Sequence, residues 1–160
     1  MTYCCEFAFA GTPTSGDVGS YKVMLTATDG NSNVSDSFEI EVESSLVLTG
    51  TDQEVTYTED ELLVIPALNI ESDAASVTVS ISLSDSASGA LSSDESILSA
   101  SFAGGVWTAT SDAATLNSLL ASLTFTPAAN YDQAVTLTID VTDSNDQSIS
   151  DEMVLDVTAV

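Results

Sequence analysis

Carboxylates are the side chains of this sequence best suited to chemistry. The 160 residues include 25 Asp and Glu but a single cation, Lys22, and no His, which gives a formal net charge of −24. With almost no salt-bridge partners, these carboxylates must face water, accept hydrogen bonds or bind cations. Because oxygen-only ligand sets suit Ca²⁺, calcium is the first partner to expect. A solvated acidic surface that keeps the protein soluble is the alternative.

The missing residue types exclude several functions. A nucleic-acid binder needs Lys or Arg to neutralise phosphates, and an anionic membrane surface would repel this chain. The absence of His removes Ser-His-Asp catalysis. A glycosidase with two carboxyl groups remains formally open, but no other feature of the sequence supports an enzyme.

Cysteines and apolar runs also narrow the class. The two cysteines are the neighbours Cys4 and Cys5, which cannot build a disulfide framework. No apolar run is long enough to cross a bilayer, and no signal peptide with a basic start is present. We therefore expect no membrane insertion, with any secretion signal outside this segment.

An internal repeat organises the chain. Thr12-Pro13 recurs as Thr126-Pro127, an offset of 114 (126 − 12). The same offset carries the alternating apolar residues of 23–27, and the Thr-Asp-x-Asn that follows them, onto 137–145. After one extra residue in the second loop, Ser35-Asp36 matches Ser150-Asp151. The order of a Thr-Pro pair, a strand, an acidic loop and a strand thus occurs twice.

The repeat predicts two domains. Residues 45–160 form one complete unit, residues 1–44 are the C-terminal fragment of a preceding unit, and 44–53 is the linker. The fragment supplies about three strands, whose apolar faces need a partner sheet. It either packs on the complete module or pairs with the same fragment of a second chain as a homodimer. Neighbouring repeats of the same chain are the other expected partners.

The elements that must position the acids are mainly strands. Strict alternation predicts half-buried strands at 77–83, 135–141 and 153–157, and at 21–27 and 38–42 in the fragment. Gly104-Gly105 predicts a hairpin turn. Ser111 or Asp112 caps a short helix containing Leu116, Leu119, Leu120 and Leu123. About seven strands plus one short helix predict an all-β, antiparallel Greek-key sandwich of the cadherin or immunoglobulin kind.

Three stretches carry a resemblance to known repeats. Residues 116–145, LNSLLASLTFTPAANYDQAVTLTIDVTDSN, resemble the tandem cadherin-like repeats of very large secreted bacterial adhesins, and YTEDELLVI at 57–65 is similar to their opening strand. Residues 11–43 resemble dystroglycan-type cadherin-like and bacterial immunoglobulin-like modules. The resemblance implies an extracellular, cell-surface role in adhesion, extension or polysaccharide contact, with Ca²⁺ stiffening the module junctions.

The resemblance also implies particular ligands. Glu59 matches the opening-strand Glu of cadherins, and Asp143 and Asp29 match the Asp that follows the penultimate strand. The linker motif of alternating Asp and Asn is reduced to Asp52, and the two-Asp loop motif to single acids at Asp73 and Asp85. Fewer or weaker calcium sites than in true cadherins are therefore expected.

Expected strand directions sort the candidate metal ligands into two clusters. The end facing the preceding module holds Asp52, Asp85, Asp143 and Asn145, with Asp17 of the preceding unit completing the set. The opposite end holds Glu59, Asp73 and Asp132. For each acid the alternative is a turn residue that caps its own backbone.

The sequence thus predicts a non-catalytic, extracellular structural or adhesion module of a tandem-repeat bacterial surface protein. The alternative is a carbohydrate-binding module whose exposed aromatics stack on a glycan. An exposed row of aromatics on one sheet face, Trp107 or tyrosines, would favour the carbohydrate-binding alternative, and a buried Trp107 would weaken it. Tyr57 and Tyr131 are expected as packing or rim residues.

Overall fold

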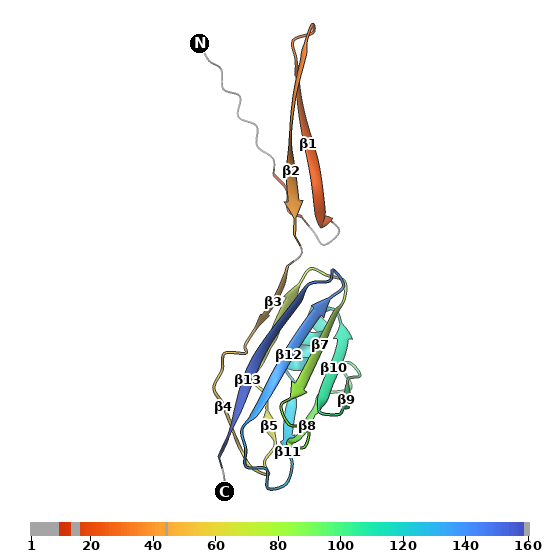
Figure 1. Ribbon diagram of the computed structural model, residues 1–160. Coiled ribbons are helices and arrows are strands. Elements are labelled where there is room, and N and C mark those ends of the chain that lie inside the picture. Colours follow the sequence, from red (N-terminus) through yellow and green to blue (C-terminus); the bar gives the residue numbers. More distant parts are fainter. Residues whose placement is uncertain (1–9, 14–16, 44, 159–160) are drawn as a thin grey trace. The chain divides into compact units, whose positions relative to one another are not determined.

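The chain divides into two compact units, which are described separately. The structure, a computed structural model, describes residues 10–13, 17–43 and 45–158 (Figure 1). The N-terminal unit comprises Met1–Glu43 and the C-terminal unit Ser44–Val160. That the N-terminal unit is the end of a preceding repeat stays a prediction. No helix in the described ranges has the length and apolarity needed to span a bilayer.

The N-terminal unit is a long hairpin of β1 (Gly19–Thr28) and β2 (Asn33–Val42). The strands pair antiparallel from Gly19 opposite Val42 to Thr28 opposite Asn33. Alternating apolar and polar side chains favour this extended conformation. Two strands are formed in the described part of the unit, where three were expected.

The C-terminal unit is built on a six-stranded sheet in the order β4-β13-β12-β7-β10-β9 (Figure 1). Its strands are β4 (Val55–Thr58), β7 (Val77–Leu83), β9 (Ser101–Ala103), β10 (Val106–Ser111), β12 (Val135–Asp143) and β13 (Ser148–Thr158). The apolar side chains of β7 and β12 are buried while Thr, Ser and Asp alternate with them on the other face. The alternation seen in the sequence therefore sets which face of the sheet packs inward.

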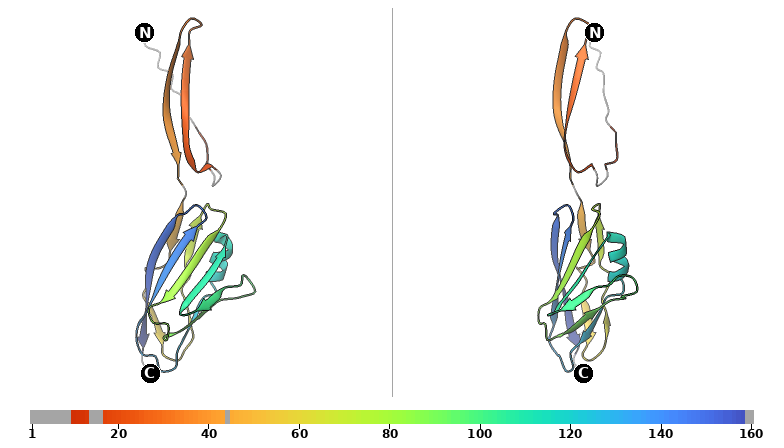
Figure 2. Two further views of the ribbon diagram at one scale, coloured as in Figure 1. Left: turned by 45° about the vertical axis from the view of Figure 1, so that its right-hand side comes forward. Right: turned by 90° about the vertical axis from the view of Figure 1, so that its right-hand side faces the viewer.

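A second layer covers that apolar face (Figure 2). It consists of the sheet β5-β11-β8 and the pair β3-β6. These strands are β3 (Leu46–Thr49), β5 (Leu63–Val64), β6 (Asn69–Ser72), β8 (Gly89–Ser92) and β11 (Thr124–Pro127). One continuous apolar core, which includes Phe125 and Trp107, joins the layers. The predicted all-β sandwich is confirmed.

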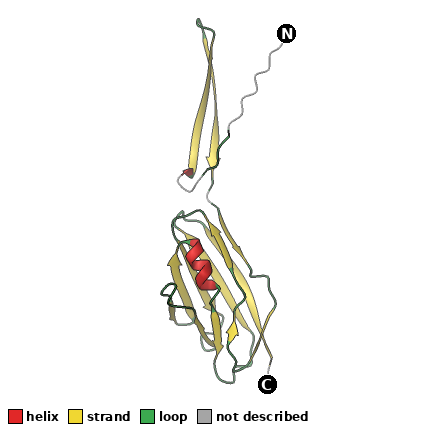
Figure 3. Cartoon of the chain, turned by 180° about the vertical axis from the view of Figure 1, so that it is seen from behind, coloured by secondary structure: helices red, strands yellow, loops and turns green. Residues whose placement is uncertain are grey.

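Helix α1 (Ala113–Leu120) closes the second layer beside β6 (Figure 3). Asp112 caps it as predicted, accepting the Thr115 N–H at 3.0 Å. Asn117 pairs with the backbone of Ile70 as a strand would, because its side chain accepts the Ile70 N–H at 2.8 Å and donates to the Ile70 oxygen at 2.9 Å. The helix ends before Leu123, which is buried in the segment that leads into β11.

The predicted linker 44–53 is wrong at residues 46–49, which form β3. The alternating Leu46 and Leu48 turn toward the core, and β3 pairs antiparallel with β6. The chain then crosses at Gly50 into the other layer as β4. Gly50 has a φ of +94°, and a Cβ there would lie 2.5 Å from the Ala67 oxygen. Only glycine fits this crossing.

Candidate functional site

The turn between β12 and β13 holds the most buried carboxylate of the predicted set. Asp143 is 5% exposed. Its Oδ1 accepts the backbone N–H groups of Asn145 at 2.8 Å and Gln147 at 3.0 Å. Its Oδ2 accepts the Ser72 hydroxyl at 3.2 Å. One side chain therefore orders its own turn and fixes it to the end of β6, because hydrogen bonds to an ionised acceptor are among the stronger ones.

Asp29 organises the turn of the N-terminal hairpin in the same way. Its Oδ1 accepts the N–H groups of Asn31 at 2.9 Å and Ser32 at 2.7 Å. These two hydrogen bonds, the Asn31 bond foremost, hold the pKa of Asp29 below its usual value. Asp29 is exposed, whereas Asp143 is buried. The turn between β12 and β13 is one residue longer than the turn between β1 and β2, as the extra residue in the second copy of the sequence repeat predicts.

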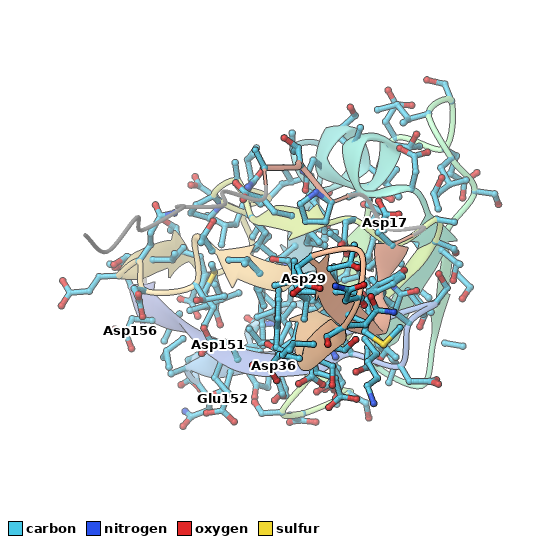
Figure 4. The ribbon with its side chains drawn as sticks, turned by 90° about the horizontal axis from the view of Figure 1, so that it is seen from above. Asp17, Asp29, Asp36, Asp151, Glu152 and Asp156 are labelled. Atoms are coloured by element: carbon cyan, nitrogen blue, oxygen red, sulfur yellow. The ribbon has the colours of Figure 1, made fainter. Side chains whose placement is uncertain are left out.

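The strand register also repeats between the two hairpins. Val23 lies opposite Phe38 as Leu137 lies opposite Met153, and Leu25 opposite Asp36 as Ile139 lies opposite Asp151. Asp36 and Asp151 each accept the N–H of the following residue at 2.8 Å. Figure 4 marks Asp29 and Asp36 of the first hairpin and Asp151 of the second. The sequence repeat is therefore also a repeat of hairpin structure.

Asp85 does not lie in the cluster that was predicted around Asp143. β7 runs antiparallel to β12, with Val77 opposite Asp143 and Leu83 opposite Leu137. Asp85 follows β7, so it lies at the other end of the sheet, about 20 Å of strand away. There its Oδ2 accepts the Tyr131 hydroxyl at 3.3 Å. The grouping of Asp85 with Asp143 is wrong because the expected direction of β7 was reversed.

Asp73 lies at the opposite end of the sandwich from the end that was predicted. It follows Ser72, the residue that donates to Asp143, and its Oδ1 accepts the Ser45 N–H at 3.2 Å. Asp73 therefore lies at the Asp143 end, not with Glu59 and Asp132 as predicted. Asn145 lies in the Asp143 turn, as expected.

Glu59 and Asp132 do lie at one end of the sandwich, around Tyr57. The Glu59 N–H donates to the Thr158 oxygen at 3.3 Å, and the Tyr57 hydroxyl to the Gln133 oxygen at 2.8 Å. Burial raises the pKa of Tyr57, and the nearby Tyr131, Asp132 and Glu59 add to the increase.

Asp52 and Asp17 complete the predicted set. The residue before Asp52 is Thr51, whose buried hydroxyl donates to Asp151. Asp151 lies in the middle of the paired region of β12 and β13. Asp52 therefore lies away from the Asp143 end of the sandwich, where it was predicted. Asp17 belongs to the N-terminal unit. Within the part of the chain that the structure describes, no three His, Cys, Asp or Glu side chains gather closely enough to hold a metal ion.

Two polar contacts of this region were missed by the sequence analysis. Ser72 reaches Asp143 across 71 positions, and Thr51 reaches Asp151 across 100. The Thr51 hydroxyl, with the Glu152 N–H as the second cause, lowers the pKa of Asp151. Each contact joins residues far apart in the sequence, so no local pattern indicates it.

The aromatic residues were proposed as sugar platforms or packing residues. Trp107 is 1% exposed, and its Nε1 donates to the Ser93 hydroxyl at 3.3 Å. Tyr57 is buried edge-on against Phe125, with ring centroids 5.5 Å apart. The core role of Trp107 is confirmed, so this residue presents no face on which a glycan could stack.

Comparisons with known proteins give similarity to solved structures alone. No protein-family model matches the chain, and no curated protein is similar to it. Domains 4 and 5 of the S-layer protein SbsC match with a TM-score of 0.42 and 11% identity, over 87% of this chain and 58% of that one. BcpA, the major pilin subunit of Bacillus cereus, matches with a TM-score of 0.36 and 13% identity, over 86% and 48%. The chain thus spans about half the length of each.

Proposed function

We propose that this protein is a non-catalytic, extracellular structural module of a tandem-repeat surface protein. The observation that carries the proposal is the recurrence of one hairpin in both units of the chain, with corresponding strand pairs and an aspartate that orders the turn in each. A chain that repeats a β-sandwich element at a fixed offset is typical of an array of modules. The extracellular location and a role in adhesion are parts of the proposal that rest on the sequence resemblance.

The state of the carboxyl groups supports a non-catalytic role. A general acid needs a carboxyl group whose pKa is raised. Among the described residues, each carboxyl group whose pKa is displaced is displaced downward by hydrogen bonds: Asp29, Asp94, Asp112 and Asp151. These groups stay ionised near neutral pH and act as acceptors that order turns and a helix end.

The ends of the C-terminal unit are arranged to resist tension. β4, near its start, runs parallel to β13, the last strand, with Val55 opposite Leu155 and Thr58 opposite Thr158. Pulling the two ends apart drags these strands in opposite directions along their length. The hydrogen bonds between them are then loaded together and not one after another, which suits a module that transmits force.

Calcium stays a prediction within this proposal. A site at the Asp143 end would draw on Asp143, Asn145 and Asp73, which the structure brings to one end of the unit. The oxygens of Asp143 already accept three hydrogen bonds. The structural role proposed here rests on the repeated hairpin and not on an ion.

Single-molecule stretching of the full chain tests the structural role. With handles at residue 45 and at residue 158, the C-terminal unit should unfold in one step at high force. In a control variant the handles are at residues 45 and 147, because that geometry does not shear β4 against β13. If both geometries give the same low force, the unit is not built to transmit tension and the proposal fails.

A further inference from the structure

The hairpin of the N-terminal unit presents an apolar face, formed by Tyr21, Val23, Leu25, Phe38, Ile40 and Val42. We call it the hairpin face. Tyr21, Leu25, Phe38 and Ile40 are 45%, 41%, 41% and 38% exposed. At the matching positions of β12 and β13, Val135, Ile139, Met153 and Leu155 are each 0% or 1% exposed. The same face is therefore buried in one unit and exposed in the other.

The C-terminal unit shows what covers this face when it is buried. β7 pairs with the free side of β12, and β4 pairs in parallel with the end of β13. Phe125 of β11 belongs to the same buried cluster as Leu137 and Leu155. All of these covering elements come from residues 46–127, the part of the sandwich that precedes the hairpin.

An open hollow lies at the base of the hairpin. It is lined by residues 10–13, Asp17, Ile40 and Val42, and its volume is about 390 Å³. At the repeat offset, Gly11 corresponds to Phe125, which is fully buried against Tyr57. A Cβ on Gly11 would meet nothing within 4 Å. The hollow therefore has room for an aromatic ring supplied by whatever covers the face.

The charge of the strands in direct contact with the face distinguishes the possible partners. Residues 17–43 contain six acids and one cation, Lys22, so two copies of the hairpin would bring two strongly negative elements together. The strands that cover the equivalent face are different. Val55–Thr58, Val77–Leu83 and Thr124–Pro127 contain no charged residue. These strands would place no charged side chain against the face, although residues 46–127 as a whole contain eleven acids and no Lys or Arg.

We propose that the hairpin face is the docking surface for the front part of a preceding β-sandwich, with the chemistry of residues 46–127. A neutral alternating strand pairs beside β1, as β7 does beside β12. A second strand runs parallel to the end of β2, as β4 does along β13, and places its Tyr at the hollow. This inference rests on the proposed tandem-repeat function and names the partner of one of its units.

In the test chain, a copy of residues 45–124 replaces residues 1–10 and is joined directly to Gly11, so that Gly11-Thr12-Pro13 takes the place of Phe125-Thr126-Pro127. Hydrogen exchange of peptides covering 19–28 and 33–42 is the measurement. We expect these amides to exchange at least 100-fold more slowly than in the unextended chain. Leu25→Asp, on the hairpin face, should abolish this protection. Met24→Asp, on the opposite face of β1, should preserve it.

A second chimaeric chain tests the proposal without relying on the new junction of the first one. Here residues 12–43 replace residues 126–158 of the full chain, so that the first hairpin stands where the second normally lies. A cooperative melt with Trp107 buried supports the proposal. If neither arrangement protects the hairpin, the proposal is overturned.

The remaining outcome assigns the face to a second copy of the chain. Sedimentation of the unextended chain would then show a dimer that Leu25→Asp dissociates and Met24→Asp leaves intact, which overturns the proposal. The stretching test of the C-terminal unit does not involve the hairpin face. Failure of this inference is thus separable from failure of the proposed function.

Discussion

Asp143 and Ser72, which are 71 positions apart in the sequence, are joined by a hydrogen bond of 3.2 Å at one end of the sandwich. The same carboxylate accepts two backbone N–H groups of its own turn. Its removal would leave three partly buried hydrogen bonds without their acceptor, and such losses are costly. Asp143 thus ties the β12–β13 turn to the end of β6 in the other layer.

Asp143→Ala should destabilise the C-terminal unit by about 3 kcal/mol, and Ser72→Ala by about 1 kcal/mol. Urea unfolding followed by Trp107 fluorescence measures both. Asp29→Ala, which removes the equivalent aspartate of the N-terminal hairpin, is the matched control and should leave this transition unchanged. Equal midpoints for Asp143→Ala and the parent chain would show that the buried acceptor contributes nothing.

Gly50→Ala should cost roughly 3 kcal/mol, because the backbone strain at positive φ is joined by a steric clash. A Cβ at Gly50 would lie 2.5 Å from the Ala67 oxygen. Gly104→Ala is the control: its φ is +62° but nothing lies within 4 Å of the added Cβ, so about 1 kcal/mol is expected. Thermal melts of the two variants separate the clash from the strain. Equal losses would refute the close approach.

Much of the fold could be predicted because its signals are local. Alternation fixed the inward faces of β7 and β12, and the Gly104-Gly105 pair and Asp112 marked a hairpin and a helix start. β3 was not predicted because it has only four residues and is followed by an acidic stretch that contains Gly, a pattern that is typical of a linker. Its strand character depends on pairing with β6, some twenty residues away, and such pairing is not written in the local sequence.

The candidate site was predicted less well than the fold, for the same reason. That Asp143 is a turn residue follows from the Thr-Asp-x-Asn pattern. Which acids share its end of the sandwich depends on the direction in which β6 and β7 run. Because β7 runs opposite to the expected direction, Asp85 lies beside Tyr131 and Asp73 lies beside Ser45. Strand direction is a property of the whole topology, so no residue-level pattern could supply it.

Acid should weaken the cap of helix α1. The Thr115 N–H foremost, and then its hydroxyl, lower the pKa of Asp112 in the folded state below the usual 3.8. A carboxyl group with a depressed folded pKa contributes stability above its unfolded pKa and loses it as the pH falls through the folded value. Asp112→Ala should therefore lower the melting temperature at pH 7. The difference from the parent chain should shrink steadily below about pH 4.

Exposed Asp140 offers the control for this pH profile. It accepts the Ser150 hydroxyl at 2.6 Å on the outward face of the sheet and caps no helix. Asp140→Ala should shift the melting temperature less at pH 7. A difference between Asp112→Ala and the parent chain that persists unchanged at pH 2.5 would show that the helix does not rely on the ionised cap.

Calcium binding at the Asp143 end should depend on Asp73 and not on Asp85. Ca²⁺ binding to the folded state raises the melting temperature by mass action, and we expect a larger rise with millimolar Ca²⁺ than with Mg²⁺. Asp73→Asn should remove most of this rise because Asp73 follows Ser72, the hydrogen-bond partner of Asp143. Asp85→Asn, at the Tyr131 end, should leave it intact. If Ca²⁺ and Mg²⁺ raise the melting temperature of the parent chain equally, these acids bind no specific calcium ion and act only as hydrogen-bond acceptors and as a solvated surface.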